Sequence, residues 1–334
     1  MKQFGSASPV KIEKVEYHGW KNALRISNDT VELIVLTEVG PRIISYRFLG
    51  EQNEFHEVPE HSGQTGGNDF RSYGGHRLWV SPEVDRTYFP DNVPIYVSQK
   101  ADNFVFTAPP EAAPPGTNLQ KEIEIGIDET GTHVSVTHRI TNLGHEVTEM
   151  AVWALSVMAA GGKAILSFPP KGPFSKDRLL PEGVMALWSY TDFTDSRWII
   201  GSKYIQLKQD RNPPGNFKEQ MTGIYNPSGW GAYYREGHLF VKRAEVHKGA
   251  RYPDFGCNFE VYTEPSFLEL ETLGPLQILK PGEAAQHQEN WWLFKDVPAG
   301  EDDAWVDNAI LEVVEKLPFA PLARWEEITA APRP

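Results

Sequence analysis

The sequence contains a single cysteine, Cys257, among its 334 residues. One cysteine excludes an internal disulfide and any zinc knuckle built from paired cysteines. Basic residues are also scarce relative to acidic ones, since the formal net charge is −13 and the isoelectric point is near 5.3. Nucleic acid and anionic membranes attract basic surfaces, so neither is an expected partner.

Long hydrophobic runs are absent as well. The chain has a mean hydropathy of −0.42, no stretch of membrane-spanning length, and no signal-peptide pattern in its first residues. We therefore expect a cytoplasmic protein, or a periplasmic or secreted one if a leader has been removed. No obligate protein partner is indicated.

The motifs of nucleotide, zinc and serine-nucleophile chemistry are missing too. The chain has no HExxH, no GxGxxG that opens a helix and no GxSxG. We predict no cofactor and no bound metal. Calcium held by clustered glutamate and asparagine oxygens is the alternative, because a hard cation takes such ligands.

Short β-branched and aromatic runs dominate the sequence instead. Many alternate with period two and none is followed by a helix of crossover length, which indicates antiparallel sheets and an all-β fold. The segments are 31–37, 42–49, 94–99, 121–128, 132–142, 148–159, 197–207, 229–235, 238–246, 258–263, 267–273 and 287–294. A helical pattern occurs only at 301–317, with apolar residues Val306, Ile310, Val313 and Leu317.

The domain organisation follows from these elements. Strand patterns of the same kind flank the proline-rich segment 108–116, which favours a surface loop over a linker. We expect one large β domain at 10–297 and a C-terminal helix and tail at 298–334 packed on it.

One expected hairpin carries an unusual set of carboxylates. Alternate residues of a strand point to opposite faces, so the apolar residues of 258–263 and 267–273 share one face. The other face gathers Asn258, Glu260, Glu269 and Glu271 beside Tyr262 and Phe267. Carboxylates among aromatics suit a sugar ring, and crowding raises their pKa values, which favours acid–base work. The alternative is an ordinary solvated sheet face.

Two motifs resemble the aldose 1-epimerase (galactose mutarotase) superfamily. The run LELETLGPLQILKPGEAAQHQENWWLF at 268–294 is similar to its closing segment, with Leu270-Glu271-Thr272 and the turn Leu279–Glu283 in the matching places. YGGHRLWVSPE at 73–83 resembles its Gly-Gly segment, most closely in an uncharacterised bacterial branch with a GGHRLW motif. The resemblance implies a β-supersandwich of antiparallel sheets with the ligand on a concave sheet surface.

The resemblance also implies catalytic roles. Glu271 matches the general base, whereas Ala154 stands where the family has its acid histidine, and Tyr73 replaces a sugar-contacting histidine. His76 is our candidate for a substitute acid, although a histidine beside two glycines is also a common packing residue. His287 matches a last-strand histidine, for which we expect a structural role.

Three further residues are candidates for substrate binding. Arg77 offers forked donors and Trp79 a stacking surface, while a structural ion pair of Arg77 with Glu83 is the alternative. Lys203 is a candidate because a lysine in the middle of the expected strand 197–207 is unusual if that face is buried.

The sequence thus predicts a carbohydrate-active isomerase, aldose 1-epimerase-like, that acts on a small-molecule sugar with Glu271 as base. A non-catalytic carbohydrate-binding protein and a glycoside lyase or hydrolase on the same fold are the alternatives.

Overall fold

The computed structural model describes residues 10–111 and 118–318, so part of the proline-rich segment 108–116 and the end of the C-terminal segment lie outside the described residues. Contacts divide the chain into two compact units. Unit 1 comprises residues 1–159 and 276–293, and unit 2 comprises residues 160–275 and 294–334. The predicted domain boundary at residue 297 stays a prediction.

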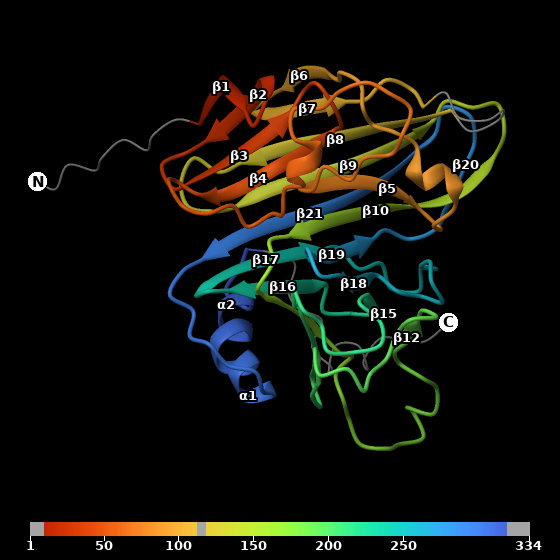
Figure 1. Ribbon diagram of the computed structural model, residues 1–334. Helices are drawn as coiled ribbons and strands as arrows, with labels where there is room; N and C mark the ends of the chain where they lie inside the picture. Colours follow the sequence, from red (N-terminus) through yellow and green to blue (C-terminus); the bar gives the residue numbers. More distant parts are fainter. Residues whose placement is uncertain (1–9, 112–117, 319–334) are drawn as a thin grey trace, which may run out of the picture. The chain divides into compact units, whose positions relative to one another are not determined.

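Unit 1 consists of antiparallel strands in two sheets (Figure 1). The first contains β1 (Lys11–Tyr17), β2 (Trp20–Ser27), β3 (Val31–Leu36), β4 (Arg42–Phe48), β5 (His76–Ser81) and β10 (Thr148–Met158), with β20 (Gln277–Leu279) paired to β10. The second contains β21 (Ala284–Phe294), β9 (Val134–Asn142), β8 (Leu119–Ile127), β7 (Asn103–Thr107) and β6 (Tyr96–Lys100). Two 3₁₀ turns, Pro59–His61 and Asp85–Tyr88, interrupt the loops.

Unit 2 repeats this arrangement on a smaller scale. Its first sheet contains β19 (Leu268–Leu273), β18 (Phe259–Thr263), β15 (Gln220–Ile224) and β12 (Met185–Leu187). Its second contains β17 (His238–Ala244), β16 (Trp230–Arg235), β11 (Lys163–Ser167), β14 (Tyr204–Lys208) and β13 (Trp198–Ile200). The all-β prediction is therefore confirmed.

Alternation explains why these segments form strands. In β9 every second residue from Val134 to Asn142 is buried, and β8 follows nearly the same pattern. The buried residues pack between the two sheets of each unit, as in other sheet-on-sheet folds. In unit 2, for example, Gly231 of β16 faces the side chains of Leu270 and Phe259.

The C-terminal helical segment runs from Asp303 to Val314 as α1 (Asp303–Trp305), a π-helical stretch (Val306–Leu311) and α2 (Glu312–Val314). Its buried residues Val306, Ile310 and Val314 pack on an apolar cluster of β11, β16 and β17. The predicted face contained Val313 instead of Val314. The π-helical stretch accounts for the difference, because its i→i+5 hydrogen bonds shift later residues around the axis.

Among the described residues, no helix has the length and apolar character needed to cross a bilayer.

Candidate functional site

The hairpin of β18 and β19 forms as the sequence predicts. Glu260 lies opposite Glu271, and Tyr262 lies opposite Glu269. The turn is closed by the N–H of Glu264, which donates to the carbonyl of Phe267 at 3.1 Å. Residues directly opposite in an antiparallel pair point to the same side, so these four side chains share one face. We call this set the carboxylate face.

The carboxylate face is turned away from the interior of unit 2. Phe259 and Leu270, which occupy the alternate positions, contact Gly231 of the other sheet. On the carboxylate face, Gly223 of β15 lies opposite Glu260. A Cβ at Gly223 would lie 2.8 Å from the Cys257 sulfur and 3.0 Å from Glu260 Cγ, so glycine makes room for both side chains.

Burial distinguishes the carboxylate face from a solvated sheet surface. The exposed fractions are 0% for Glu260, 7% for Glu269 and 1% for Glu271. Because glutamates decorate an open sheet face by remaining in water, the solvated alternative is wrong. Burial also raises the pKa of Tyr262, and the nearby Glu264 and Glu269 raise it further.

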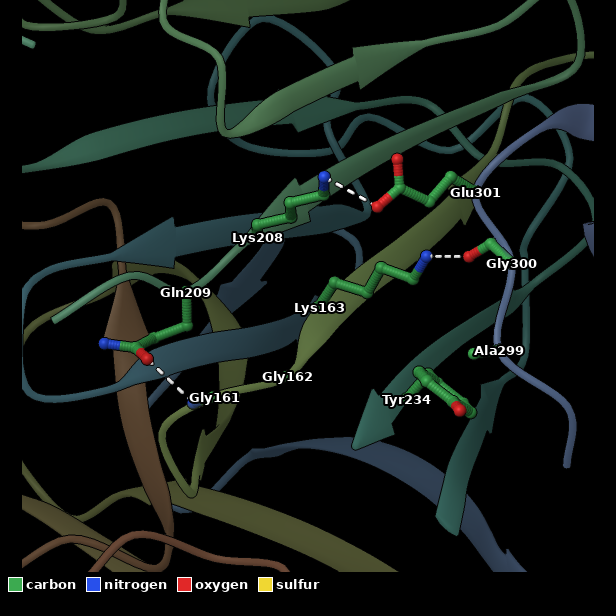
Figure 2. Close-up of a pocket in the computed structure, with 9 residues that line it drawn as sticks. All are labelled: Gly161, Gly162, Lys163, Lys208, Gln209, Tyr234, Ala299, Gly300 and Glu301. Carbon is green, nitrogen blue, oxygen red and sulfur yellow. Dashed lines mark hydrogen bonds and ion pairs between the residues drawn. The ribbon is translucent and has the colours of Figure 1, made fainter. Parts of the chain in front are cut away.

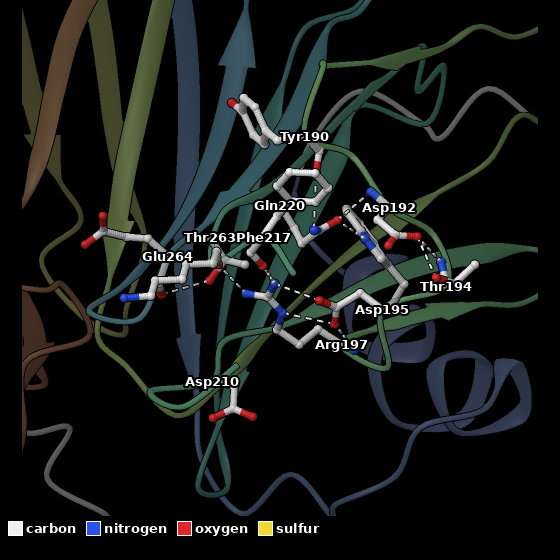
Figure 3. A network of polar contacts seen from close by, with 12 residues as sticks. Tyr190, Asp192, Thr194, Asp195, Arg197, Asp210, Phe217, Gln220, Thr263 and Glu264 are labelled. Atoms are coloured by element: carbon white, nitrogen blue, oxygen red, sulfur yellow. Dashed lines mark hydrogen bonds and ion pairs between the residues drawn. The ribbon is translucent and has the colours of Figure 1, made fainter. Parts of the chain in front are cut away.

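A polar network supports an aromatic residue beside this face (Figure 3). Tyr190 packs edge-on against Tyr262, with 6.4 Å between ring centroids. Gln220 of β15 holds its loop, since its side chain donates to the carbonyl of Tyr190 at 3.2 Å and accepts from the N–H of Asp192 at 2.8 Å. The sequence predicts only a loop at residues 192–197. It did not predict the polar network in which these residues take part.

Asn258 and Lys203 have structural contacts. The Asn258 side chain accepts from the backbone N–H of Asn226 at 2.7 Å and donates to its carbonyl at 2.9 Å. Lys203 is not in mid-strand as predicted, because Gly201 and Ser202 turn the chain between β13 and β14. Its side chain is 57% exposed and its ammonium lies 2.6 Å from Asp307 Oδ2. Binding of substrate by either residue stays a prediction.

In unit 1, β5 separates the predicted residues onto two faces. Arg77 and Trp79 share one face, where the guanidinium carbon lies 3.9 Å from the centre of the Trp79 ring. Trp153 of β10 lies opposite Trp79, with 5.3 Å between ring centroids. Tyr88 contacts the same ring at 5.2 Å. Arg77, Trp79 and Trp153 are buried, at 4%, 8% and 5% exposure, so these cation–π and aromatic contacts pack the cluster together. Binding of substrate by Arg77 and Trp79 stays a prediction.

His76 points the other way, into the interior of unit 1, and is 0% exposed. Its Nδ1 lies 2.9 Å from Ser156 Oγ, and its Nε2 lies 2.6 Å from His138 Nε2. His138 Nδ1 donates to the carbonyl of His287 at 3.1 Å. In the neutral pair His138 Nε2 is therefore the acceptor, so His76 Nε2 donates and Ser156 donates to His76 Nδ1. The backbone contact fits the structural role expected for His287.

The same histidines form a cluster that reasoning from the sequence missed. Ligand atoms of His76, His138 and Glu289 lie within 4.8 Å of one another, a grouping of the kind that holds metals. Two nitrogens on one tetrahedral zinc lie about 3.4 Å apart, given bonds of about 2.1 Å. The observed 2.6 Å instead fits a shared proton. His138 and Glu289 occupy buried positions of strands along which buried and more exposed residues alternate. This alternation was the one feature of the sequence that could have placed both side chains in the interior.

Tyr73 and Ala154 also belong to the interior. The Tyr73 hydroxyl donates to Asn92 Oδ1 at 2.8 Å, and the ring joins an apolar cluster with Trp20 and Ile44. Ala154 lies opposite Leu78, on the same face as His76. Its neighbours Trp153 and Leu155 occupy the face of Arg77, so a histidine at position 154 would not point there.

The two glycines of the YGGHRLW motif have a structural explanation. Gly74 and Gly75 have φ of +91° and +71°, values that side chains disfavour. A Cβ on Gly75 would lie 2.4 Å from the Ile43 carbonyl oxygen, and one on Gly74 would lie 2.1 Å from that of His56. The motif therefore sets the close approach of β5 to β4.

Replacing Gly75 by alanine is expected to lower the free energy of unfolding by about 2–5 kcal/mol, from the positive φ and the steric overlap together. Gly50→Ala is the matched control, since Gly50 has a φ of +76° but no atom within 4 Å of the new Cβ. It should cost only about 1–2 kcal/mol. Urea unfolding of both variants measures the difference, and equal losses would contradict the close-approach argument.

Comparison with solved structures places this architecture among known folds. A putative aldose 1-epimerase from Klebsiella pneumoniae matches with a TM-score of 0.57 and 12% identity, over 92% of this chain and 87% of that one. A galactose mutarotase related enzyme from Lactobacillus acidophilus gives 0.53 and 10%, over 82% and 98%. A galactose mutarotase-like protein from Lactobacillus casei gives 0.52 and 11%, over 82% and 100%.

These similarities establish a galactose mutarotase-like fold, as the sequence motifs implied. No protein-family model and no curated protein sequence matches the chain. The GGHRLW branch stays a prediction.

Proposed function

We propose that this chain, which has the fold of galactose mutarotases, is a carbohydrate-active isomerase that interconverts the anomers of a sugar at its carboxylate face. The observation that carries the proposal is the burial of Glu260, Glu269 and Glu271 on one face of the β18–β19 hairpin, beside Tyr262. The neighbouring structures are named as aldose 1-epimerases and mutarotases, which is why we propose a sugar as the substrate. Because fold alone does not specify chemistry, the proposal is carried by the carboxylate face.

Glu271 is the proposed general base. Its carboxylate accepts the proton of the anomeric hydroxyl while an acid protonates the ring oxygen; the sugar ring then opens to the aldehyde, rotates and closes on its other face. Glu260 lies directly opposite. Burial of Glu271 limits competition by water for that proton.

The acid that protonates the ring oxygen is less well defined than the base. His76 remains our prediction for it, but both of its ring nitrogens are engaged within unit 1, by Ser156 and His138. His76→Gln tests this prediction. Loss of anomer interconversion would support His76 as the acid, and a change in stability alone would contradict it.

Saturation-transfer NMR tests the proposal directly. Anomer interconversion is followed over a panel of neutral aldoses, uronic acids and sugar phosphates with the intact protein. Acceleration on at least one sugar is expected. Ligand-induced shifts with no acceleration on any sugar would contradict the isomerase and leave the carbohydrate-binding alternative.

A glycosidase is the second candidate, favoured by one observation. Glu260 and Glu271 face each other across the strand pair, and directly opposite residues have Cβ atoms about 4.5–5.5 Å apart. Glycosidases place their two carboxyl groups about 5–5.5 Å apart when they retain the anomeric configuration and about 6.5–9.5 Å apart when they invert it, and two glutamate side chains on opposite positions can reach either separation. Release of nitrophenol from aryl glycosides, lost in both Glu260→Gln and Glu271→Gln, would establish this reaction in place of isomerisation.

A further inference from the structure

A second pocket lies in unit 2 (Figure 2). Its volume is about 510 Å³. Its walls are residues 161–163 at the start of β11, residues 208 and 209 at the end of β14, Tyr234 of β16 and residues 299–301 before α1. None of the glutamates of the carboxylate face lines it, so the pocket is not part of the proposed sugar site.

The pocket brings two lysines together. Lys163 and Lys208 lie directly opposite each other in the β11–β14 pair, a position in which like charges repel. Lys208 Nζ lies 2.7 Å from Glu301 Oε1, and the Glu301 side chain is 59% exposed. Two lysines and this glutamate give the lining a net charge of +1. The chain as a whole carries −13, so the pocket is a local exception.

The ammonium of Lys163 is held in place. It donates to the carbonyl of Gly300 and lies 4.1 Å from the centre of the Trp305 ring. Figure 2 shows both lysine side chains extending toward residues 300 and 301. Burial lowers the pKa of Lys163 to about 8; Glu301 opposes this change and Lys208 adds to it. An added negative charge would favour the protonated amine.

An aromatic wall completes the pocket. Tyr234 lines it and is fixed edge-on against Trp305, with 5.4 Å between ring centroids. A rigid ring beside cationic groups suits a ligand with both an apolar or cyclic part and a negative charge.

We propose that this pocket is a second ligand site, which binds a small organic oxyanion between Lys163 and Lys208 with its cyclic part against Tyr234. The oxyanion displaces Glu301 from Lys208, a contact that is exposed and therefore weakly held. A phosphate monoester and a carboxylate share this chemistry.

Titration calorimetry with four probes tests the site. Phenyl phosphate should bind more tightly than inorganic phosphate because of its ring, and phenol should not bind because it lacks the charge. Benzoate distinguishes the carboxylate from the phosphate. The proposal is overturned if phenol binds as tightly as phenyl phosphate, or if none of the four probes binds.

Variants locate the binding. Lys163→Met and Lys208→Met should each weaken phenyl phosphate binding at least about tenfold, the effect of one charge-assisted hydrogen bond. Glu301→Gln should strengthen it, because it frees Lys208 without removing a packed side chain. Lys248→Met, at an exposed lysine elsewhere in unit 2, is the control and should change nothing. Equal effects of all three lysine substitutions would overturn the site.

The charge of Lys163 gives an independent readout. The charged groups that face it are Lys208 on β14 and Glu301 before α1. Carbon-13 NMR of labelled lysines should show one amine that titrates at about pH 8 and moves to higher pH when phenyl phosphate binds. Affinity should accordingly fall as the pH rises through that midpoint. A midpoint unchanged by saturating ligand would overturn the assignment.

Discussion

Replacement of Glu271 by glutamine is expected to lower the rate of anomer interconversion by about 10²–10⁴-fold, the range that a positioned general base contributes. Glutamine has the size and shape of glutamate but does not take up the anomeric proton. Because glutamine is isosteric with glutamate and Glu271 lies on the regular strand β19, the change should preserve the fold. Saturation-transfer NMR on the sugar identified with the intact protein measures the loss.

Glu269→Gln provides the matched control for this prediction. Glu269 lies on the same strand and face, two residues before Glu271, but opposite Tyr262 instead of Glu260. Its substitution should change substrate affinity more than the maximal rate. If Glu269→Gln removes activity while Glu271→Gln retains it, the base has been assigned to the wrong carboxylate.

Removal of the Asp195 carboxylate is expected to destabilise the protein by about 3–5 kcal/mol, because it leaves a buried charge without its counter-charge. The side chains of Asp195 and Arg197 are 1% and 2% exposed, and Arg197 Nη2 lies 2.8 Å from Asp195 Oδ2 (Figure 3). Arg197 also donates to the carbonyls of Lys218 and Phe217. Urea unfolding of Asp195→Ala measures the loss.

The double variant Asp195→Ala/Arg197→Met separates the charge from the packing. Because it leaves no unpaired charge, it should be more stable than Asp195→Ala alone. A double variant that is less stable would show that the hydrogen bonds to residues 217 and 218 matter more than the ion pair.

Low pH should weaken the ion pair between Asp195 and Arg197. Burial acts to raise the pKa of Asp195, but hydrogen bonds from the Arg197 side chain and backbone outweigh it and hold the pKa below the ordinary 3.8. A carboxyl with a lowered folded-state pKa stabilises the fold above its unfolded pKa and loses that contribution as the pH falls. The stability advantage over Asp195→Ala should therefore shrink below about pH 4, and an advantage independent of pH there would contradict the ion pair.

Local alternation made much of the fold predictable from the sequence. The hairpin with Glu260 and Glu271 on one face follows from a period of two and a turn at Glu264-Pro265-Ser266, both of which are local properties. The same rule failed at residues 197–207, where an apolar run predicted one strand. Gly201 and Ser202 divide it into β13 and β14 and place Lys203 in the turn, as turn chemistry would have indicated.

Pairing between distant strands was not predictable in this way. His76 and His138 are 62 residues apart, and nothing local indicates that their rings meet. Lys163 and Lys208 meet for the same reason, through the pairing of β11 with β14. The alternation identifies which face each side chain occupies but not which strand lies beside it, so the histidine cluster and the second pocket required the structure.

The alternation of β5 has a consequence for sequence change. Histidine and arginine at adjacent positions serve opposite sides of one strand, so a single inserted or deleted residue after Gly75 would exchange them. The insertion would place a guanidinium and an indole in the interior and turn the imidazole outward. We expect natural relatives to vary here by substitution and to keep the length of the segment from Gly75 to Trp79 constant. The length of this segment should then be better conserved among relatives than the identity of its residues.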